Sequence, residues 1–138
     1  YYDVYEPSFK ESLLRHLAAF VFRLHRLHIY HEDLSLGNIL VIRTPKGYDF
    51  ALVDLNRIKF REVPFAKGLK NFATLKMTRD DLNTVISEYI SLSGEPLELS
   101  MEMFWKFSQR KSMIRRFRRK VRRYTLTPLE NFLYGQHA

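Results

Sequence analysis

The chain has no cysteine among its 138 residues. Disulfides and thiolate metal sites are therefore excluded, and the absence is compatible with a reducing cytosol. The sequence also has no apolar run of about 18 residues, the length that a transmembrane helix needs. Glycine and proline are scarce, with five of each, and no repeat or low-complexity linker is present. Because 46% of the residues are hydrophobic and 14% aromatic, the chain can bury one core, and we expect residues 1–138 to form a single domain.

The most informative segment is a short polar motif. His31 and Asp33 precede Asn38 in the pattern His-x-Asp-Leu-x-x-x-Asn-Ile-Leu, and Asp54 follows sixteen residues after the amide. At this spacing, kinase-like enzymes present one catalytic base and two magnesium ligands. Phosphoryl transfer needs a carboxylate near the acceptor hydroxyl and hard oxygen ligands for Mg²⁺. Asp33 can accept the hydroxyl proton, Asn38 and Asp54 can hold the metal, and His31 would support the loop without reacting.

Two apolar runs surround a turn in the same segment. Residues 39–42 and 50–53 are apolar, and residues 44–47 between them contain the proline and glycine of a turn. A helix is disfavoured because this proline and glycine would lie in its interior. We predict a hairpin whose first strand is buried, and which brings Asn38 and Asp54 to the same side of the sheet.

The pattern around Asp33, with the later Asp54, resembles the catalytic and metal-binding loops of the protein-kinase-like superfamily. A narrower resemblance comes from Gly37, just before the motif's amide, and from residues 50–60, which read Phe-Ala-Leu-Val-Asp-Leu-Asn-Arg-Ile-Lys-Phe. These features look like the bacterial lipopolysaccharide kinases that phosphorylate sugars of the inner core, including the Kdo kinases. The similarity covers roughly residues 8–90.

This resemblance implies a function and an architecture. The intact protein would transfer the γ-phosphate of ATP to a sugar hydroxyl, with a nucleotide and an anionic glycolipid or sugar acceptor as its partners. Asp33 would be the catalytic base, with His31 in the same motif, and Asn38 and Asp54 would bind Mg²⁺ and with it the nucleotide. The fold class would be α+β, as in the mainly helical C-terminal lobe of a protein-kinase-like fold with a small catalytic β-hairpin.

The motif departs from protein kinases at two places. Ser35 and Gly37 stand where protein kinases usually carry Lys or Arg, and Asp54-Leu55-Asn56 stands where they carry Asp-Phe-Gly. Both departures favour a sugar or other small-molecule kinase. A protein or aminoglycoside kinase is the alternative among enzymes. A pseudokinase that keeps the fold as a binding or scaffold domain is the alternative among other proteins.

Two helices should surround the motif. Ser8 and Glu11 have the spacing of a capping box, and apolar residues then recur at helical spacing up to Leu27. Thr78 should cap a second helix that ends before Gly94. Residues 57–76 between the hairpin and this helix have the composition of a loop. Either acid near the start of the second helix, Asp80 or Asp81, could anchor the catalytic loop, or both could simply favour the helix N-terminus.

A complete kinase needs more than these elements. Its N-terminal lobe carries a glycine-rich loop and a lysine that bind the nucleotide phosphates. Residues 1–7, which precede the first predicted helix, are too few for such a lobe. We therefore expect the chain to be the C-terminal lobe of a longer enzyme and to be inactive alone.

One segment carries the excess positive charge. Residues 110–123 hold nine of the 23 basic residues and no acid, which leaves 14 basic residues against 15 acidic ones elsewhere. Met113, Phe117, Val121 and Tyr124 form an apolar stripe through it, as in an amphipathic helix continuous with residues 101–107. The basic residues are Arg110, Lys111, Arg115, Arg116, Arg118, Arg119, Lys120, Arg122 and Arg123.

Three interpretations of this basic segment are open. It could be the solvated outer face of a packed helix. It could contact an anionic glycolipid or the inner membrane surface, which would place the protein in the cytoplasm with a peripheral membrane contact. Nucleic-acid binding is the least favoured of the three, because no recognised nucleic-acid module accompanies the positive charge.

Overall fold

The structure is a computed structural model that describes the backbone of residues 7–134 and the side chains of residues 8–119. It is mainly helical with two small strand pairs, which confirms the predicted α+β class. Its helices are α1 (Pro7–Arg26), α2 (Phe65–Asn71), α3 (Arg79–Ser93) and α4 (Leu97–Tyr134), and its strands are β1 (Ile29–His31), β2 (Ile39–Thr44), β3 (Gly47–Leu52) and β4 (Ile58–Phe60). Short 3₁₀ turns lie between these elements, namely η1 (Leu36–Asn38), η2 (Leu55–Arg57) and η3 (Phe72–Thr74). The chain forms two compact units, Tyr1–Phe104 and Trp105–Ala138.

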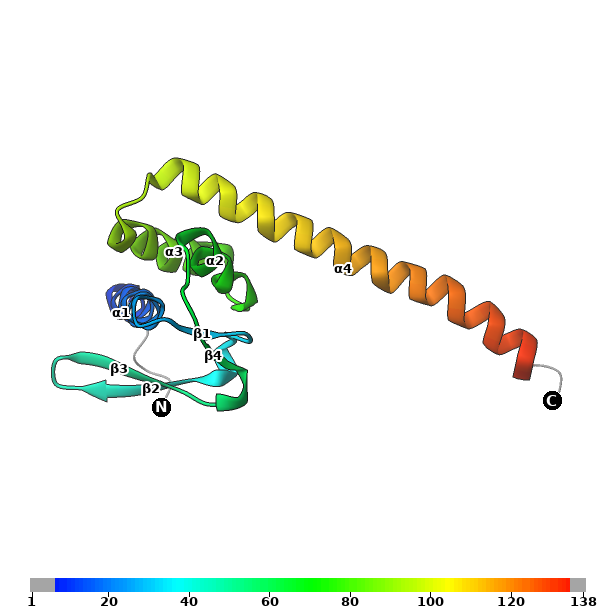
Figure 1. Ribbon diagram of the computed structural model, residues 1–138, viewed down its shortest axis with the longest axis horizontal. Helices are drawn as coiled ribbons and strands as arrows, with labels where there is room; N and C mark the ends of the chain where they lie inside the picture. Colours follow the sequence, from blue (N-terminus) through cyan, green and yellow to red (C-terminus); the bar gives the residue numbers. More distant parts are fainter. Residues whose placement is uncertain (1–6, 135–138) are drawn as a thin grey trace. The chain divides into compact units, whose positions relative to one another are not determined.

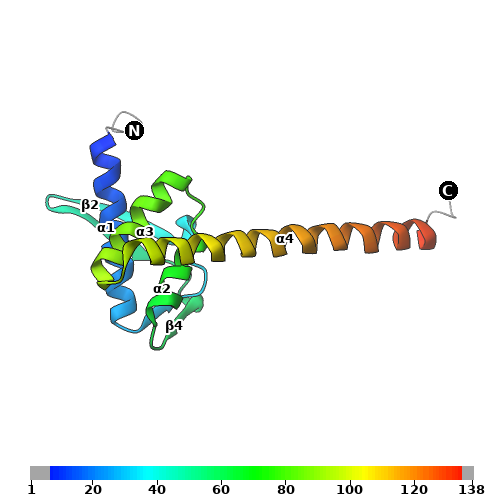
Figure 2. The ribbon, with the colours of Figure 1, turned by 90° about the horizontal axis from the view of Figure 1, so that it is seen from above.

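The core of the first unit lies between α1 and α3. The two helices run side by side, and the β2–β3 hairpin covers the opposite side of α1 (Figures 1 and 2). Five apolar residues of α3 are buried, and α1 contributes four more from one face. Each large aliphatic side chain buried in this way contributes about 1.5–3 kcal/mol. These buried residues are Leu14, Leu17, Ala18 and Val21 of α1 and Leu82, Val85, Ile86, Tyr89 and Ile90 of α3.

The ends of α3 lie where the sequence predicts them, whereas the start of α1 does not. Thr78 Oγ1 accepts a hydrogen bond from the Asp81 amide at 3.2 Å, and Gly94 ends α3 with a φ of 72°. These are the predicted cap and stop. By contrast, α1 begins at Pro7, so Ser8 lies inside the helix and the predicted capping box is wrong. Proline suits the first helical position because its φ is already helical and its missing N–H is not needed there.

Each strand pair is antiparallel. Ile39 pairs with Leu52 in the predicted β2–β3 hairpin, while β1 pairs with β4. The prediction that the first hairpin strand is buried was wrong, because Leu40, Val41 and Ile42 are 52%, 53% and 51% exposed. The hairpin packs on α1 mainly through β3, whose aromatic residues contact Phe9 and Phe20 of the helix.

The predicted loop at residues 57–76 is largely ordered into β4, α2 and η3. Strand β4 has three residues and pairs with a distant partner, so local periodicity cannot reveal it. Helix α2 has seven residues and contains Gly68. The glycine has a packing reason, since a Cβ at this position would collide with the hydroxyl of Tyr89.

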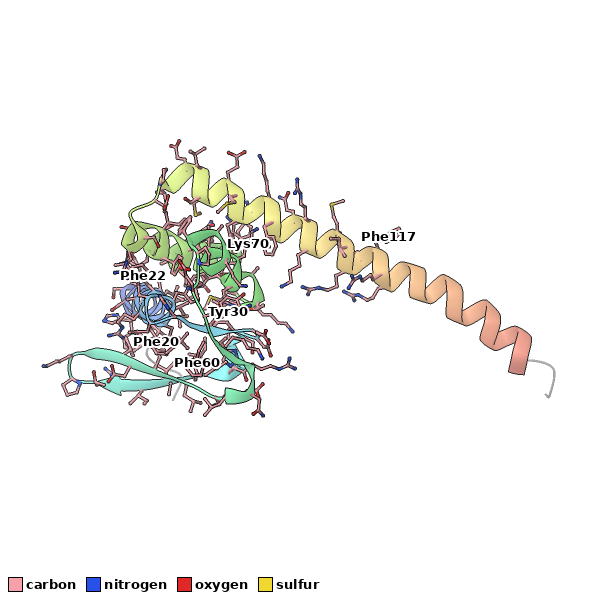
Figure 3. The ribbon with its side chains drawn as sticks, viewed as in Figure 1. Phe20, Phe22, Tyr30, Phe60, Lys70 and Phe117 are labelled. Carbon is pink, nitrogen blue, oxygen red and sulfur yellow. The ribbon has the colours of Figure 1, made fainter. Side chains whose placement is uncertain are left out.

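Helix α4 is continuous through residues 101–107 and through residues 110–123, the segment predicted to be a basic helix. Ser100 and Phe104 are buried in the first unit, whereas Met113, Ile114 and Phe117 are exposed in the second. Figure 3 shows the Phe117 side chain standing away from its helix. The other predicted stripe and basic residues, Lys120, Val121, Arg122, Arg123 and Tyr124, lie outside the described side chains. Within the described part of the chain, no helix is long and apolar enough to cross a membrane.

Candidate active site

The loop between β1 and β2 brings two of the predicted site residues into contact. Asn38 Nδ2 donates hydrogen bonds to the carbonyl oxygen of Asp33 at 2.9 Å and to its Oδ2 at 3.3 Å. Two backbone bonds tighten the loop, from Ser35 N to Asp33 O at 2.8 Å and from Asn38 N to Ser35 O at 3.0 Å. The five-residue spacing in the sequence therefore closes a compact turn. The Asp33 side chain remains exposed at its start.

The hairpin places Asp54 next to this loop. The Val53 amide donates to the Asn38 carbonyl oxygen at 3.0 Å, so the chain that delivers Asp54 is bonded directly to the residue that carries the amide. Asp54 has φ 57° and ψ 57°, the left-handed conformation, which costs a non-glycine residue on the order of 1–3 kcal/mol. Its carboxylate is 41% exposed and lies 4.0 Å from Arg57 Nε. Strained residues of this kind concentrate at functional sites.

The buried His31 side chain connects the catalytic loop to the end of β3, through hydrogen bonds with Asp33 and Val53. Its Nε2 donates to the Val53 carbonyl oxygen at 3.0 Å, and its Nδ1 accepts from the Asp33 amide at 3.2 Å. These partners require a neutral ring with its proton on Nε2. Because the side chain is buried and both ring nitrogens are occupied, His31 is placed to hold Asp33 and Val53, as a supporting residue would be.

Two residues that the sequence analysis missed also hold the loop. Asn71 at the end of α2 donates from Nδ2 to the His31 carbonyl oxygen at 3.1 Å. Thr74 in η3 donates from Oγ1 to the Leu34 carbonyl oxygen at 2.6 Å. These bonds come from the segment that the sequence analysis assigned to a loop. No local pattern marks the two residues, because their partners lie 40 positions away in the sequence.

The acids that start α3 do not anchor the loop. Asp81 forms an ion pair with Lys10 at 2.8 Å, and the hydrogen bond from Lys10 lowers the pKa of its carboxyl group. Asp80 is exposed in the first turn of α3, where a carboxylate favours the helix N-terminus. Of the two alternatives predicted for these acids, the anchoring of the catalytic loop is therefore wrong, and the position of both acids in the first turn of α3 agrees with the other.

The donor atoms of the site match the chemistry of Mg²⁺. Nδ2 of Asn38 is committed to Asp33, and its Oδ1 makes no hydrogen bond with the described residues. Asp54 adds an exposed carboxylate. One neutral and one charged oxygen suit an ion that keeps several water molecules and shares substrate phosphates. No cluster of three His, Asp or Glu side chains that could hold a metal occurs among the described residues.

The geometry also leaves Asp33 able to handle a proton. Its Oδ2 accepts from Asn38, whereas Oδ1 makes no hydrogen bond with the described part of the chain. A hydroxyl group bound at Oδ1 could transfer its proton to the exposed carboxylate. The arrangement therefore brings a candidate general base and two candidate magnesium ligands together on one short loop and one strand end.

Comparisons with known proteins identify the family and the fold of the chain. The model of the lipopolysaccharide kinase (Kdo/WaaP) family matches residues 1–89, which include all four predicted site residues. Among solved structures, one of WaaP in complex with acyl carrier protein is similar, with a TM-score of 0.62 and 20% sequence identity. The match covers 81% of this chain and 52% of that one, so the chain spans about half the length of this neighbour and shares its fold. No curated protein matches. Since the family model matches well over half of the 138 residues, the chain belongs to the lipopolysaccharide kinase (Kdo/WaaP) family.

Proposed function

We propose that the protein is a kinase that transfers the γ-phosphate of ATP to a sugar hydroxyl of the lipopolysaccharide inner core. The observation that carries this proposal is the direct contact of Asp33 with Asn38, together with the backbone bond that joins Asn38 to the strand end preceding Asp54. Membership of the family supports a lipopolysaccharide kinase. The acceptor sugar and the use of ATP belong to the proposal.

Each residue of the candidate site would have a separate role in phosphate transfer. Asp33 would accept the proton of the acceptor hydroxyl as the hydroxyl oxygen attacks the γ-phosphorus of ATP, and ADP would leave as the bond from this phosphorus to the bridging oxygen breaks. Asn38 Oδ1 and the Asp54 carboxylate would hold Mg²⁺, which neutralises phosphate charge when it is bound. His31 keeps the Asp33 backbone and the Val53 carbonyl in register. These 138 residues would be inactive alone, because their sequence has no glycine-rich loop with a phosphate-binding lysine.

Substitution of Asp33 by Asn tests the base. Asparagine keeps the size of the side chain and can still accept a hydrogen bond from Asn38, but it cannot take a proton. In the full-length protein, Asp33→Asn should lower kcat by about 10²-fold to 10⁴-fold, the usual contribution of a general base. The assay follows phosphate transfer from ATP to a purified core oligosaccharide by mass spectrometry.

Two further variants complete this experiment. Asp54→Asn should raise the Mg²⁺ concentration needed for half-maximal transfer, because a charged ligand oxygen is lost. Asp49→Asn, which changes an exposed carboxylate on β3, is the matched control and should behave like the parent. Undiminished transfer by Asp33→Asn would show that Asp33 is not the base.

We also propose that the basic part of α4 makes a peripheral contact with anionic glycolipid or with the inner face of the cytoplasmic membrane. Exposed Met113, Ile114 and Phe117 share the helix with exposed basic residues. A helix with one apolar and one basic face is suited to the membrane interface. Nucleic acid is less favoured, because phosphate contacts would leave the apolar residues uncovered. WaaP in the solved complex binds acyl carrier protein, so a carrier protein is the alternative partner to test.

A further inference from the structure

A buried row of three polar side chains runs from α3 to the catalytic loop, where it ends at the backbone carbonyl of His31. The Tyr89 hydroxyl is hydrogen-bonded to His25 Nδ1 at 2.8 Å, and His25 Nε2 to Asn71 Oδ1 at 3.1 Å. Asn71 Nδ2 then donates to the carbonyl oxygen of His31 at 3.1 Å. The exposed fractions of Tyr89, His25, Asn71 and His31 are 2%, 6%, 3% and 2%, so water cannot substitute for these partners.

The hydrogen bonds in this row have a fixed direction. The Asn71 amide must present its NH₂ group to the His31 carbonyl, because a carbonyl only accepts. Its oxygen therefore faces His25, which must carry its proton on Nε2. His25 Nδ1 is then an acceptor, and the Tyr89 hydroxyl is its donor. If the Asn71 amide were flipped, two oxygens would face each other at His31 and two N–H groups at His25.

We propose that Asn71 is a positioning residue for the catalytic loop and that His25, held by Tyr89, sets the orientation of the Asn71 amide. The effect on rate rests on the proposed kinase function, whereas the effect on loop order does not. Asn71 fixes the His31 carbonyl two residues before Asp33, and the Asp33 amide is bonded to the His31 ring. Thr74 fixes the Leu34 carbonyl on the other side. Asp33 is thus held between two attachments, of which the one through Asn71 is buried and the one through Thr74 is half-buried.

The packing around His25 keeps the row in one arrangement. Tyr30 of β1 stacks on the His25 ring with 6.0 Å between centroids, and Phe22 of α1 packs edge-on against Tyr89 at 5.9 Å. Figure 3 labels both of these residues. The absence of a side chain at Gly68 leaves space for His25, since a Cβ at this position would lie 2.8 Å from His25 Nδ1. Burial lowers the pKa of His25 to about 4, so the ring stays neutral and offers the single N–H that the row needs.

Paired substitutions can separate positioning from general stability. Asn71→Leu keeps the number and branching of the side-chain heavy atoms and removes both hydrogen bonds, and His25→Leu removes the donor to Asn71. His25→Gln offers an amide N–H in place of the imidazole N–H and serves as the conservative variant. Leu17→Ala, which changes a buried residue of α1 outside the row, is the control for lost stability alone.

The first readout is amide hydrogen exchange in the full-length protein. The Asp33 and Ser35 amides are bonded within the catalytic loop, and both should exchange at least about tenfold faster in Asn71→Leu and His25→Leu. Exchange should stay near the parental rate in His25→Gln and in Leu17→Ala. Unchanged exchange in folded Asn71→Leu would overturn the inference, and so would equal acceleration in Leu17→Ala.

The second readout is kinetic. In Asn71→Leu and His25→Leu, kcat should fall at least about tenfold while KM for ATP stays within about twofold, because a displaced base affects the chemical step. His25→Gln should recover most of the rate, and Leu17→Ala should retain it. A parent protein without phosphate transfer would refute the proposed function, and the exchange experiment would still decide the role of Asn71. Parental kcat in a folded Asn71→Leu enzyme would refute positioning.

Discussion

Lowering the pH should reduce the free energy of unfolding, mainly because His25 takes up a proton when the protein unfolds. Desolvation of the buried ring lowers its pKa from 6.5 to about 4, although the hydrogen bond with Asn71 opposes the shift. Between these two values the unfolded chain binds a proton at His25 that the folded chain does not. The free energy of unfolding must therefore fall as the pH falls through this window. A gap of about 2.5 pKa units corresponds to about 3 kcal/mol in total, of which about 2 kcal/mol is lost between about pH 7 and pH 5.

This loss is large beside the 5–15 kcal/mol or so that stabilises most domains. Urea unfolding followed by circular dichroism at several pH values gives the free energy of unfolding of the parent and of His25→Gln. The parent should lose about 2 kcal/mol more than the variant between about pH 7 and pH 5, because the other groups titrate in both proteins and cancel. His28→Asn controls for the removal of a histidine, since His28 is exposed and has a φ of 61° that asparagine tolerates. Equal pH dependence in the parent and His25→Gln would refute the reasoning.

Two further predictions concern packing and charge. Gly68→Ala should lower the free energy of unfolding by about 1–3 kcal/mol, because its methyl group would overlap Tyr89 and His25; Gly37→Ala is the control, since nothing lies within 4 Å of a Cβ there. Thermal unfolding measures both, and equal stability of the two variants would contradict the packing argument. Changing Arg115, Arg116, Arg118 and Arg119 to Glu should weaken binding to anionic vesicles by at least about 1 kcal/mol per residue, more at low salt than at high salt. Sedimentation with vesicles measures this, and unchanged binding would leave the solvated-face interpretation of α4 standing.

The parts of the fold that local physics determines were predictable from the sequence. Thr78 and Gly94 mark the ends of α3 because a cap and a left-handed stop each depend on a few adjacent atoms. The hairpin followed from its turn residues and two apolar runs. The contact between Asp33 and Asn38 was also predictable, because residues five positions apart can meet across one tight turn.

The parts that depend on distant partners were not predictable. Strand β4 has three residues and exists through its pairing with β1, and η3 has no periodicity of its own. Exposure of β2 depends on how many elements cover it, which its own apolar residues do not reveal. Asn71 shows the limit most clearly. An asparagine in a segment of mixed composition looks like a loop residue until the His31 carbonyl, 40 positions earlier, is placed beside it.

The geometry of the candidate site therefore depends on buried residues that are not themselves the proposed base or metal ligands. Asp33 and Asp54 are exposed, on a loop and at the end of a two-stranded hairpin, and an isolated hairpin of this kind is marginally stable in water. Their geometry must be imposed by the buried residues behind them, namely His31, Leu34 and Asn71. Substitutions that remove the hydrogen bonds of His25 or Asn71 but spare the fold should then reduce the rate more than a substitution of equal cost in stability elsewhere in the core, such as Leu17→Ala. Among these buried residues, the hydrogen bond between Asn71 and His31 links the helical core to the proposed catalytic base.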